Sequence, residues 1–170
     1  AAVRVPKTFD FVDGVLIMEL IKDRKGHPAP RMVDITFQPD ESRELLQTLL
    51  REVIRMLCEG VVHGDLSNFN ILIGIDGPVI IDFPQAVDTA HNRNARRLLI
   101  RDVNNLTYFL SRYAPELRRL KYGQEMWALY EDAKLQPDTK LTGKFRPKNG
   151  KIDNDALVRE IQAAAREAAA

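Results

Sequence analysis

The chain has 170 residues, of which 45% are hydrophobic and 29% are charged, and its net charge is only +1. This balance is that of one globular domain, and it excludes a chain that is basic or acidic as a whole. The single cysteine, Cys58, excludes an intramolecular disulfide and a cysteine-based metal site. No apolar run reaches the ~20 residues of a membrane-spanning helix, and no signal-peptide pattern is found, so we expect a cytoplasmic protein without a membrane partner.

The first part of the chain alternates apolar runs with turn signals. Residues 9–21 predict a hairpin that turns at an Asp-Gly pair. Residues 22–39 contain three prolines and predict a loop. An apolar stripe predicts a helix over residues 40–59, with Asp40 or Ser42 as its N-terminal cap.

The rest of the chain predicts one more hairpin followed by helices. Residues 71–83 predict the hairpin, which turns at its own Asp-Gly pair. Helices are predicted over residues 94–113, over residues 115–135 and after Asp153. Residues 136–151 are rich in Lys, Pro and Gly and predict a polar linker. The order of elements predicts an α+β fold that is mostly helical, with little sheet.

Polar residues with chemical potential follow the first long helix, in the stretch "VVHGDLSNFN" at residues 61–70. Asp65 and Asn70 lie on this loop, and Asp82 lies at the end of the following hairpin. Because a hairpin folds back on itself, Asp82 returns close to Asn70. Asn70 and Asp82 suit Mg²⁺, and Asp65 can accept a proton from an attacking hydroxyl. Taken singly, each residue is also typical of loops, where Asp and Asn bond their own backbone.

The joint pattern is more specific than its members. "HxDLxxxN" followed by an apolar hairpin that ends in "IIDF" has the spacing of the protein-kinase catalytic loop and metal-binding aspartate. The chain resembles the C-terminal lobe of a protein-kinase-like phosphotransferase, and most closely the RIO family of atypical kinases. Gly64 stands where most kinases have Arg, and "HNRNARRLLIRDVNNLTYFL" and "GHPAPRMVD" are similar to RIO segments. The resemblance spans about residues 12–115.

The resemblance implies a domain organisation. Residues 1–21 would form the hinge-proximal hairpin and the hinge, residues 22–135 the kinase-like C-lobe, and residues 136–170 a basic linker and C-terminal helix. Kinases cover the phosphates with a glycine-rich loop and use a strand lysine paired with a helix glutamate. None of these is found before residue 9, so we expect a chain without the N-lobe, inactive on its own.

The resemblance also implies roles for the polar residues. Asp65 would be the catalytic aspartate, and Asn70 and Asp82 would bind the metal, Mg²⁺ or Mn²⁺. His63 would brace the catalytic loop. Asp102 resembles the helix aspartate that accepts hydrogen bonds from the backbone amides of that loop, an orienting role.

Five further residues would form the ATP-binding surface. Met18 would be the gatekeeper, and the backbones of Glu19 and Ile21 would hold the edge of the adenine. Leu72 and Ile81 would form the apolar floor, a role that ordinary core residues at these positions would also permit.

The resemblance implies an ATP- and Mg²⁺-dependent RIO-type serine/threonine kinase or ATPase, with a protein substrate or autophosphorylation. One alternative is a small-molecule phosphotransferase of the aminoglycoside or choline kinase kind. Ser67 and the absence of "HPGN" argue against it. The other is a non-catalytic module that associates with RNA or the ribosome through phosphate contacts, although such charge runs are usually solvated. Its basic residues would be Lys140, Lys144, Arg146, Lys148 and Lys151.

Overall fold

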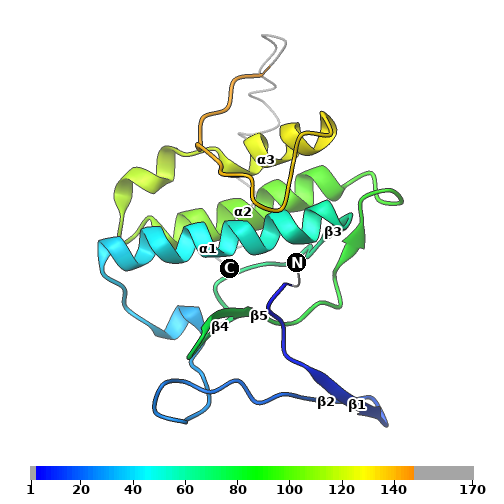
Figure 1. Ribbon diagram of the computed structural model, residues 1–170, viewed down its shortest axis with the longest axis vertical. Coiled ribbons are helices and arrows are strands. Elements are labelled where there is room, and N and C mark those ends of the chain that lie inside the picture. Colours follow the sequence, from blue (N-terminus) through cyan, green and yellow to red (C-terminus); the bar gives the residue numbers. More distant parts are fainter. Residues whose placement is uncertain (1–2, 148–170) are drawn as a thin grey trace, which may run out of the picture.

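The computed structural model describes residues 3–147, and its helices stand on one side of its short hairpins (Figure 1). The elements are β1 (Thr8–Val12), β2 (Val15–Met18), the short 3-10 helix η1 (Met32–Asp34), α1 (Pro39–Cys58), β3 (Val61–Val62), β4 (Ile71–Gly74), β5 (Gly77–Ile80), β6 (Val87–Asp88), α2 (Ala95–Leu110), the 3-10 helix η2 (Pro115–Arg119) and α3 (Tyr122–Glu131). The strands form three antiparallel pairs, β1–β2, β3–β6 and β4–β5. The predicted α+β, mostly helical fold is confirmed.

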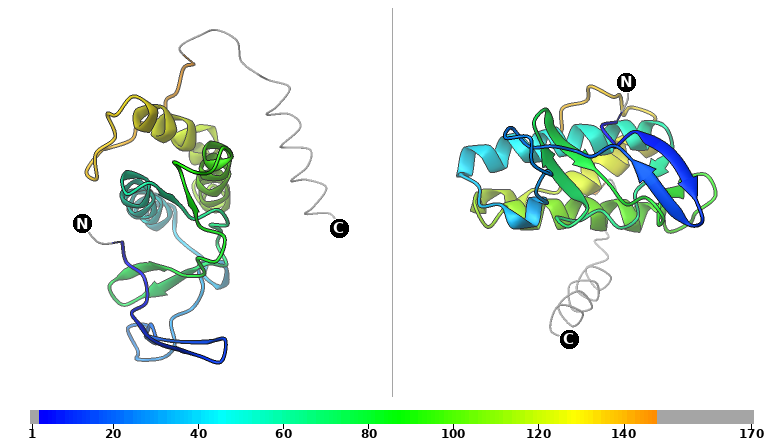
Figure 2. Two further views of the ribbon diagram at one scale, coloured as in Figure 1. Left: turned by 90° about the vertical axis from the view of Figure 1, so that its right-hand side faces the viewer. Right: turned by 90° about the horizontal axis from the view of Figure 1, so that it is seen from below.

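The core lies between α1, α2 and α3, which pack together (Figures 1 and 2). The predicted apolar stripe of α1 faces inward, and Leu49 on it is fully buried. On α2, Val103 and Leu106 are fully buried as well. A fully buried side chain of this kind contributes about 1.5–3 kcal/mol relative to an exposed one. The packed helices therefore give the polar loop a rigid base. Within the described residues, no helix is both long enough and apolar enough to cross a membrane.

Helix α1 begins differently from the prediction. Neither Asp40 nor Ser42 is the N-cap, because Pro39 occupies the first helical position and Gln38 precedes it as the cap. Proline suits that position, since its missing N–H would have no helical partner there. The Glu41 carboxylate accepts the Gln38 N–H at 2.8 Å, as in a capping box.

The hairpin β1–β2 projects away from the helices (Figure 1). It turns at the predicted Asp-Gly pair, but β2 ends at Met18, where the prediction extended to residue 21. All residues of both strands are exposed, including Phe11 at 67%. The second hairpin turns at residues 75–76, one position earlier than predicted.

The helix predicted over residues 115–135 is two separate elements, η2 and α3. Between them, Leu120 has an extended backbone, and the Lys121 N–H donates to the Gly143 carbonyl at 2.8 Å. The break therefore forms where a distant segment docks, which local propensity does not reveal.

That segment, residues 141–144, is named the strap. Although the sequence predicts a polar linker there, the strap packs on α3. The Glu125 carboxylate accepts hydrogen bonds from the backbone N–H groups of Thr142 and Gly143 and from the Thr142 hydroxyl, at 2.6–3.0 Å. The helix predicted after Asp153 lies outside the described residues.

Glu125→Ala tests the strap. Loss of this acceptor is expected to lower the free energy of unfolding by about 1–2 kcal/mol, since Glu125 satisfies several donors at once. Hydrogen exchange of the Gly143 amide should accelerate. Glu131→Ala, which removes an exposed acid from the same helix, is the control and should change stability by less than about 0.5 kcal/mol. Unchanged exchange at Gly143 in Glu125→Ala would contradict the assigned anchor.

Candidate active site

The polar loop, residues 63–70, leaves β3 and crosses the side of α2. Its residues alternate between buried and exposed around Asp65. Gly64 and Leu66 are buried, whereas Asp65 between them is exposed. Leu66, fully buried, fixes the loop in the core. The loop therefore holds its carboxylate toward solvent from an anchored backbone.

Asp102 on α2 is the main anchor. Its side chain is 1% exposed, and its carboxylate accepts the Gly64 N–H at 2.8 Å and the Leu66 N–H at 3.1 Å. This is the contact that the sequence predicted for Asp102. Burial raises the pKa of Asp102 to about 6, and the two N–H donors limit the rise.

Two residues near Asp102 bind the carbonyls of the same two loop residues, Gly64 and Leu66. Arg101 donates from its guanidinium to the Gly64 carbonyl, and Asn105 donates from its side-chain amide to the Leu66 carbonyl at 3.2 Å. Sequence reasoning missed both residues. The signal that could have found them is the position of Asn105, three residues after Asp102 and four after Arg101, because residues at these intervals are neighbours on a helix surface.

His63 ties the polar loop to the segment before Asp82. Its Nδ1 accepts the Asp65 N–H at 3.3 Å, so Nε2 carries the proton and donates to the Ile81 carbonyl at 3.0 Å. The ring is 1% exposed and packs on Phe83, with 4.7 Å between the centroids. The bracing role predicted for His63 matches these contacts.

Asn70 links the two ends of the site. The side-chain Nδ2 of Asn70 donates to the backbone carbonyl of Asp65 at 2.7 Å. The backbone carbonyl of Asn70 accepts the Ile81 N–H at 3.0 Å. Asp82 follows Ile81 directly and is exposed. Its backbone is left-handed (φ 68°), a conformation that Asp adopts more readily than most residues. The structure thus brings Asp65, Asn70 and Asp82 into one connected segment.

The donor set of this segment suits one class of ion. The Asn70 amide nitrogen is bound to the loop, which leaves Oδ1 as its acceptor, and Asp82 offers a carboxylate. No group of three or more His, Cys, Asp or Glu side chains able to hold a metal is found within residues 3–147. Two protein oxygens fit Mg²⁺, which keeps water and phosphate ligands, better than an ion that needs a complete protein cage.

Three of the predicted adenine-binding residues lie at the end of β2 and in the connection that follows it. Met18 is 46% exposed, and Ile21 is buried. The Glu19 N–H donates to the Lys7 carbonyl and the Ile21 carbonyl accepts the Ala29 N–H, both at 2.8 Å. Within the described part of the chain, the Glu19 carbonyl and the Ile21 N–H form no hydrogen bond.

The predicted floor residues, Leu72 on β4 and Ile81 after β5, are half-buried. The backbone of Leu72 also forms an isolated antiparallel β-bridge with that of Arg31. Ile81 occupies a more central position than the sequence suggested, because its N–H bonds Asn70 and its carbonyl bonds His63.

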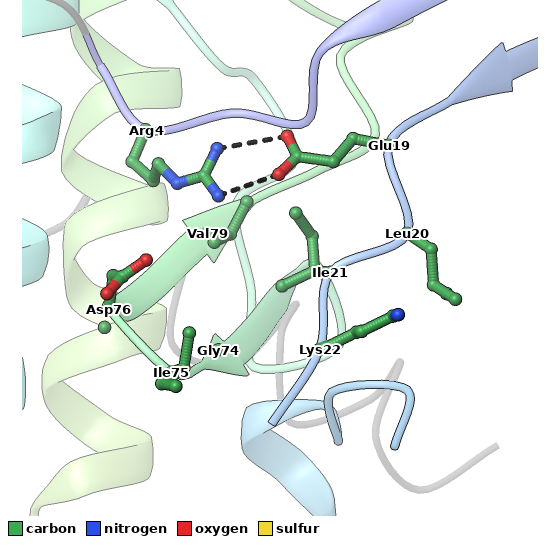
Figure 3. A pocket seen from close by; sticks show the side chains of 10 residues that line it. Arg4, Glu19, Leu20, Ile21, Lys22, Gly74, Ile75, Asp76 and Val79 are labelled. Atoms are coloured by element: carbon green, nitrogen blue, oxygen red, sulfur yellow. Dashed lines mark hydrogen bonds and ion pairs between the residues drawn. The ribbon is translucent and has the colours of Figure 1, made fainter. Parts of the chain in front are cut away.

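A cavity of about 220 Å³ lies between residues 19–22 and the turn of β4–β5 (Figure 3). Arg4 and Glu19 face each other at this cavity through two hydrogen bonds of 3.1 and 3.2 Å, and this bonding lowers the pKa of the Glu19 carboxyl. Because Asp65, Asn70 and Asp82 do not line it, the cavity lies at residues 19–22 and not at the polar loop.

The glycine of "HGD" has a structural reason. Gly64 has φ +82°, and a Cβ on it would lie 2.3 Å from the Gln85 carbonyl oxygen. A side chain at this position would have to displace the backbone that follows Asp82. Sequence reasoning treated Gly64 as a family marker and missed this close approach.

Comparisons with known proteins agree with the resemblance. A family model of the RIO domain matches residues 1–123. The chain is 39% identical over 112 residues to the RIO-type serine/threonine-protein kinase Rio1 of Methanocaldococcus jannaschii, covering 65% of this chain and 37% of that protein. It is 38% identical over 116 residues to the protein of the same name from Haloferax volcanii, covering 66% and 37%. With the serine/threonine-protein kinase rio2 of Schizosaccharomyces pombe it shares 37% identity over 111 residues, covering 64% and 30%. The chain thus spans 30–37% of the length of these curated relatives.

Gly64→Ala tests the close approach to Gln85. Gly60→Ala is the matched control, because Gly60 has a similar φ of +74° but its Cβ would meet only Thr89 at 3.4 Å. The left-handed backbone should cost both variants about 1–2 kcal/mol. The clash should cost Gly64→Ala a further 1–3 kcal/mol or so in chemical denaturation. Equal losses in the two variants would contradict the proposed clash.

The pKa of Asp102 predicts a pH dependence of stability. Because the pKa in the folded chain is about 6, above the ordinary 3.8, the folded state binds the proton more tightly. The contribution of Asp102 to the free energy of unfolding is fully present below pH 3.8. It declines as the pH rises through 6, by up to about 3 kcal/mol in total. Asp102→Asn cannot titrate there. Between pH 4 and pH 7, the unfolding free energy of the wild type should therefore fall relative to that of Asp102→Asn. If the difference between the two unfolding free energies does not change with pH, the raised pKa of Asp102 is refuted.

Proposed function

Because this chain belongs to the RIO domain family, we propose that it carries the phosphoryl-transfer residues of an ATP- and Mg²⁺-dependent serine/threonine kinase or ATPase. The relatives it matches are named serine/threonine kinases. The observation that carries the proposal is the placement of Asp65. Its carboxylate is exposed, while Asp102, Arg101 and Asn105 fix the peptides on both sides of it.

Asp65 acts on the hydroxyl that receives the phosphoryl group. An exposed carboxylate on an anchored backbone can orient a hydroxyl and accept its proton without a change in the loop. The bond from Asn70 to the Asp65 carbonyl fixes the distance between this residue and the metal ligand. Phosphoryl transfer depends mainly on such positioning, because the protein has little covalent chemistry to perform.

Asn70 and Asp82 would hold the metal, Mg²⁺ or Mn²⁺. When bound, the metal neutralises charge on the phosphates of the nucleotide. Asp82 is held from both sides, since Ile81 bonds His63 and Asn70 while Phe83 packs on His63. Pro84 follows, where other kinases have glycine in "DFG". Its fixed φ and missing N–H oppose a peptide flip, so this aspartate stays in one orientation.

The hinge residues hold the adenine. The Glu19 carbonyl would accept a hydrogen bond from the edge of the adenine and the Ile21 N–H would donate one to it. Met18 would be the gatekeeper, and Leu72 and Ile81 would form the apolar floor. The hydrogen bonds that Glu19 and Ile21 already form leave these two groups available. The acceptor is a serine or threonine of a protein substrate or of the enzyme itself.

The test uses the full-length protein with radiolabelled ATP, measuring ATP hydrolysis and autophosphorylation. Asp65→Asn should reduce both rates by about 100-fold or more, because the hydroxyl or water is no longer oriented. Asp82→Asn should raise the Mg²⁺ concentration needed for half-maximal rate. Asp138→Asn, at an exposed acid in the loop after α3, is the control and should stay within about twofold.

Thermal unfolding of each variant separates loss of activity from loss of fold. Rates equal to those of the wild type in both Asp65→Asn and Asp82→Asn would rule out the proposed function.

A further inference from the structure

The exposed side of α2 and the segment after it concentrate positive charge. Between residues 93 and 121 the chain has eight basic residues and two acidic ones, although its net charge is only +1. All eight basic side chains are exposed. Of the two acids, Asp102 is buried and Glu116 pairs with Arg43 at 2.6 Å. Neither acid of residues 93–121 is therefore free to balance these basic side chains, and the exposed carboxylate beside them is Asp65 in the polar loop.

Part of this charge forms a line along one helical face, here named the α2 stripe. Its exposed members follow at intervals of three or four residues, the spacing of one face of a helix. They are Arg97, Arg101, Asn105, Tyr108 and, just beyond the end of α2, Arg112.

The α2 stripe meets the polar loop at Asp65. Arg101 donates to the Gly64 carbonyl and Asn105 to the Leu66 carbonyl, so these two members of the stripe lie on either side of Asp65. A segment that brings its hydroxyl to Asp65 therefore arrives beside the stripe. The positive charge of the stripe would then attract negatively charged residues of that segment next to the one that carries the hydroxyl.

We propose that the α2 stripe binds an acidic segment of the phosphoacceptor protein. This inference rests on the proposed function and names the substrate class of the same site. Arg97 lies one helical turn before Arg101, about 6 Å along the axis, which is roughly two residues of extended chain. Acidic side chains within about two to four positions of the acceptor would reach these guanidinium groups, which bind carboxylates through two parallel hydrogen bonds.

The arginines are available for this role. Within residues 3–147, Arg97 and Arg112 form no ion pair, and Arg101 has only its buried neighbour Asp102, at 3.9 Å. A guanidinium is always charged and only weakly hydrated, so pairing with a substrate carboxylate is favourable at an exposed site. The Arg101 guanidinium donates from one nitrogen to the Gly64 carbonyl and has further N–H donors besides.

The aromatic residues near the stripe favour a peptide over RNA. Single-stranded RNA is bound largely by stacking bases on open aromatic rings. The Tyr108 ring, which belongs to the stripe, already has the Arg118 guanidinium 5.3 Å from its centroid. The stripe is also short, about 22 Å from Arg97 to Arg112, which suits a peptide of about seven extended residues.

Peptide binding by the full-length protein tests the proposal without requiring catalysis. The probes are fluorescent peptides with one central serine flanked by glutamates, alanines or lysines, measured by anisotropy. The glutamate peptide should bind about tenfold more tightly than the alanine peptide, and more weakly as salt is added. Arg97→Glu should abolish this preference and Arg97→Lys should keep much of it. Arg51→Glu, on an exposed face of α1, is the control of equal charge change and should leave affinity within about twofold.

Phosphoryl transfer to the same peptides separates docking from folding. Arg97→Glu should raise KM for the glutamate peptide about tenfold and leave kcat within about twofold. A structural role for Arg97 would lower kcat for every peptide. Equal binding of the three peptides by the wild type would overturn the inference. An RNA oligonucleotide that loses binding in Arg97→Glu while the peptides do not would overturn it as well. Failure of the proposed function would be seen separately, as ATP hydrolysis that Asp65→Asn leaves unchanged.

Discussion

The buried carboxylate of Asp102 is the contact on which the site depends. Taking a carboxylate out of water is costly, and the N–H groups of Gly64 and Leu66 offset part of that cost. In return, one side chain fixes the two residues that flank Asp65. The Asp65 carboxylate can stay in solvent because its backbone is held from beneath. An exposed group with an anchored backbone is what a positioning function requires.

The geometry of the polar loop is therefore set by the packing of α2. Val103 and Leu106 face the core and fix the rotation of the helix about its axis. That rotation directs Asp102 toward the loop amides and places Arg101 and Asn105 beside the loop carbonyls. The same rotation leaves the α2 stripe in solvent. Core packing, loop geometry and surface charge are thus consequences of one helix orientation.

The sequence predicted those features that depend on neighbours along the chain. The apolar stripe of α1 and the Asp-Gly turn of the first hairpin are local, and both were predicted. The grouping of Asn70 with Asp82 also followed, because a hairpin must return its ends to each other. Failures occurred where a distant residue decides. Leu120 breaks a helix because Gly143 docks beside it, and Gly64 excludes a side chain because Gln85 passes across it. No local pattern reveals either contact.

The two sides of the polar loop present different surfaces, and the proposed phosphoryl transfer would need such a difference. In-line transfer requires the attacking and leaving oxygens on opposite sides of the moving phosphoryl group. Asn70 and Asp82 flank the β4–β5 hairpin, which lies on the side of the helices from which β1–β2 projects (Figure 1). The α2 stripe instead follows the helix that anchors Asp65. A nucleotide held from the hairpin side and an acidic acceptor held along α2 would meet at Asp65 from different directions. The loop that joins these two surfaces would then also set the line of transfer.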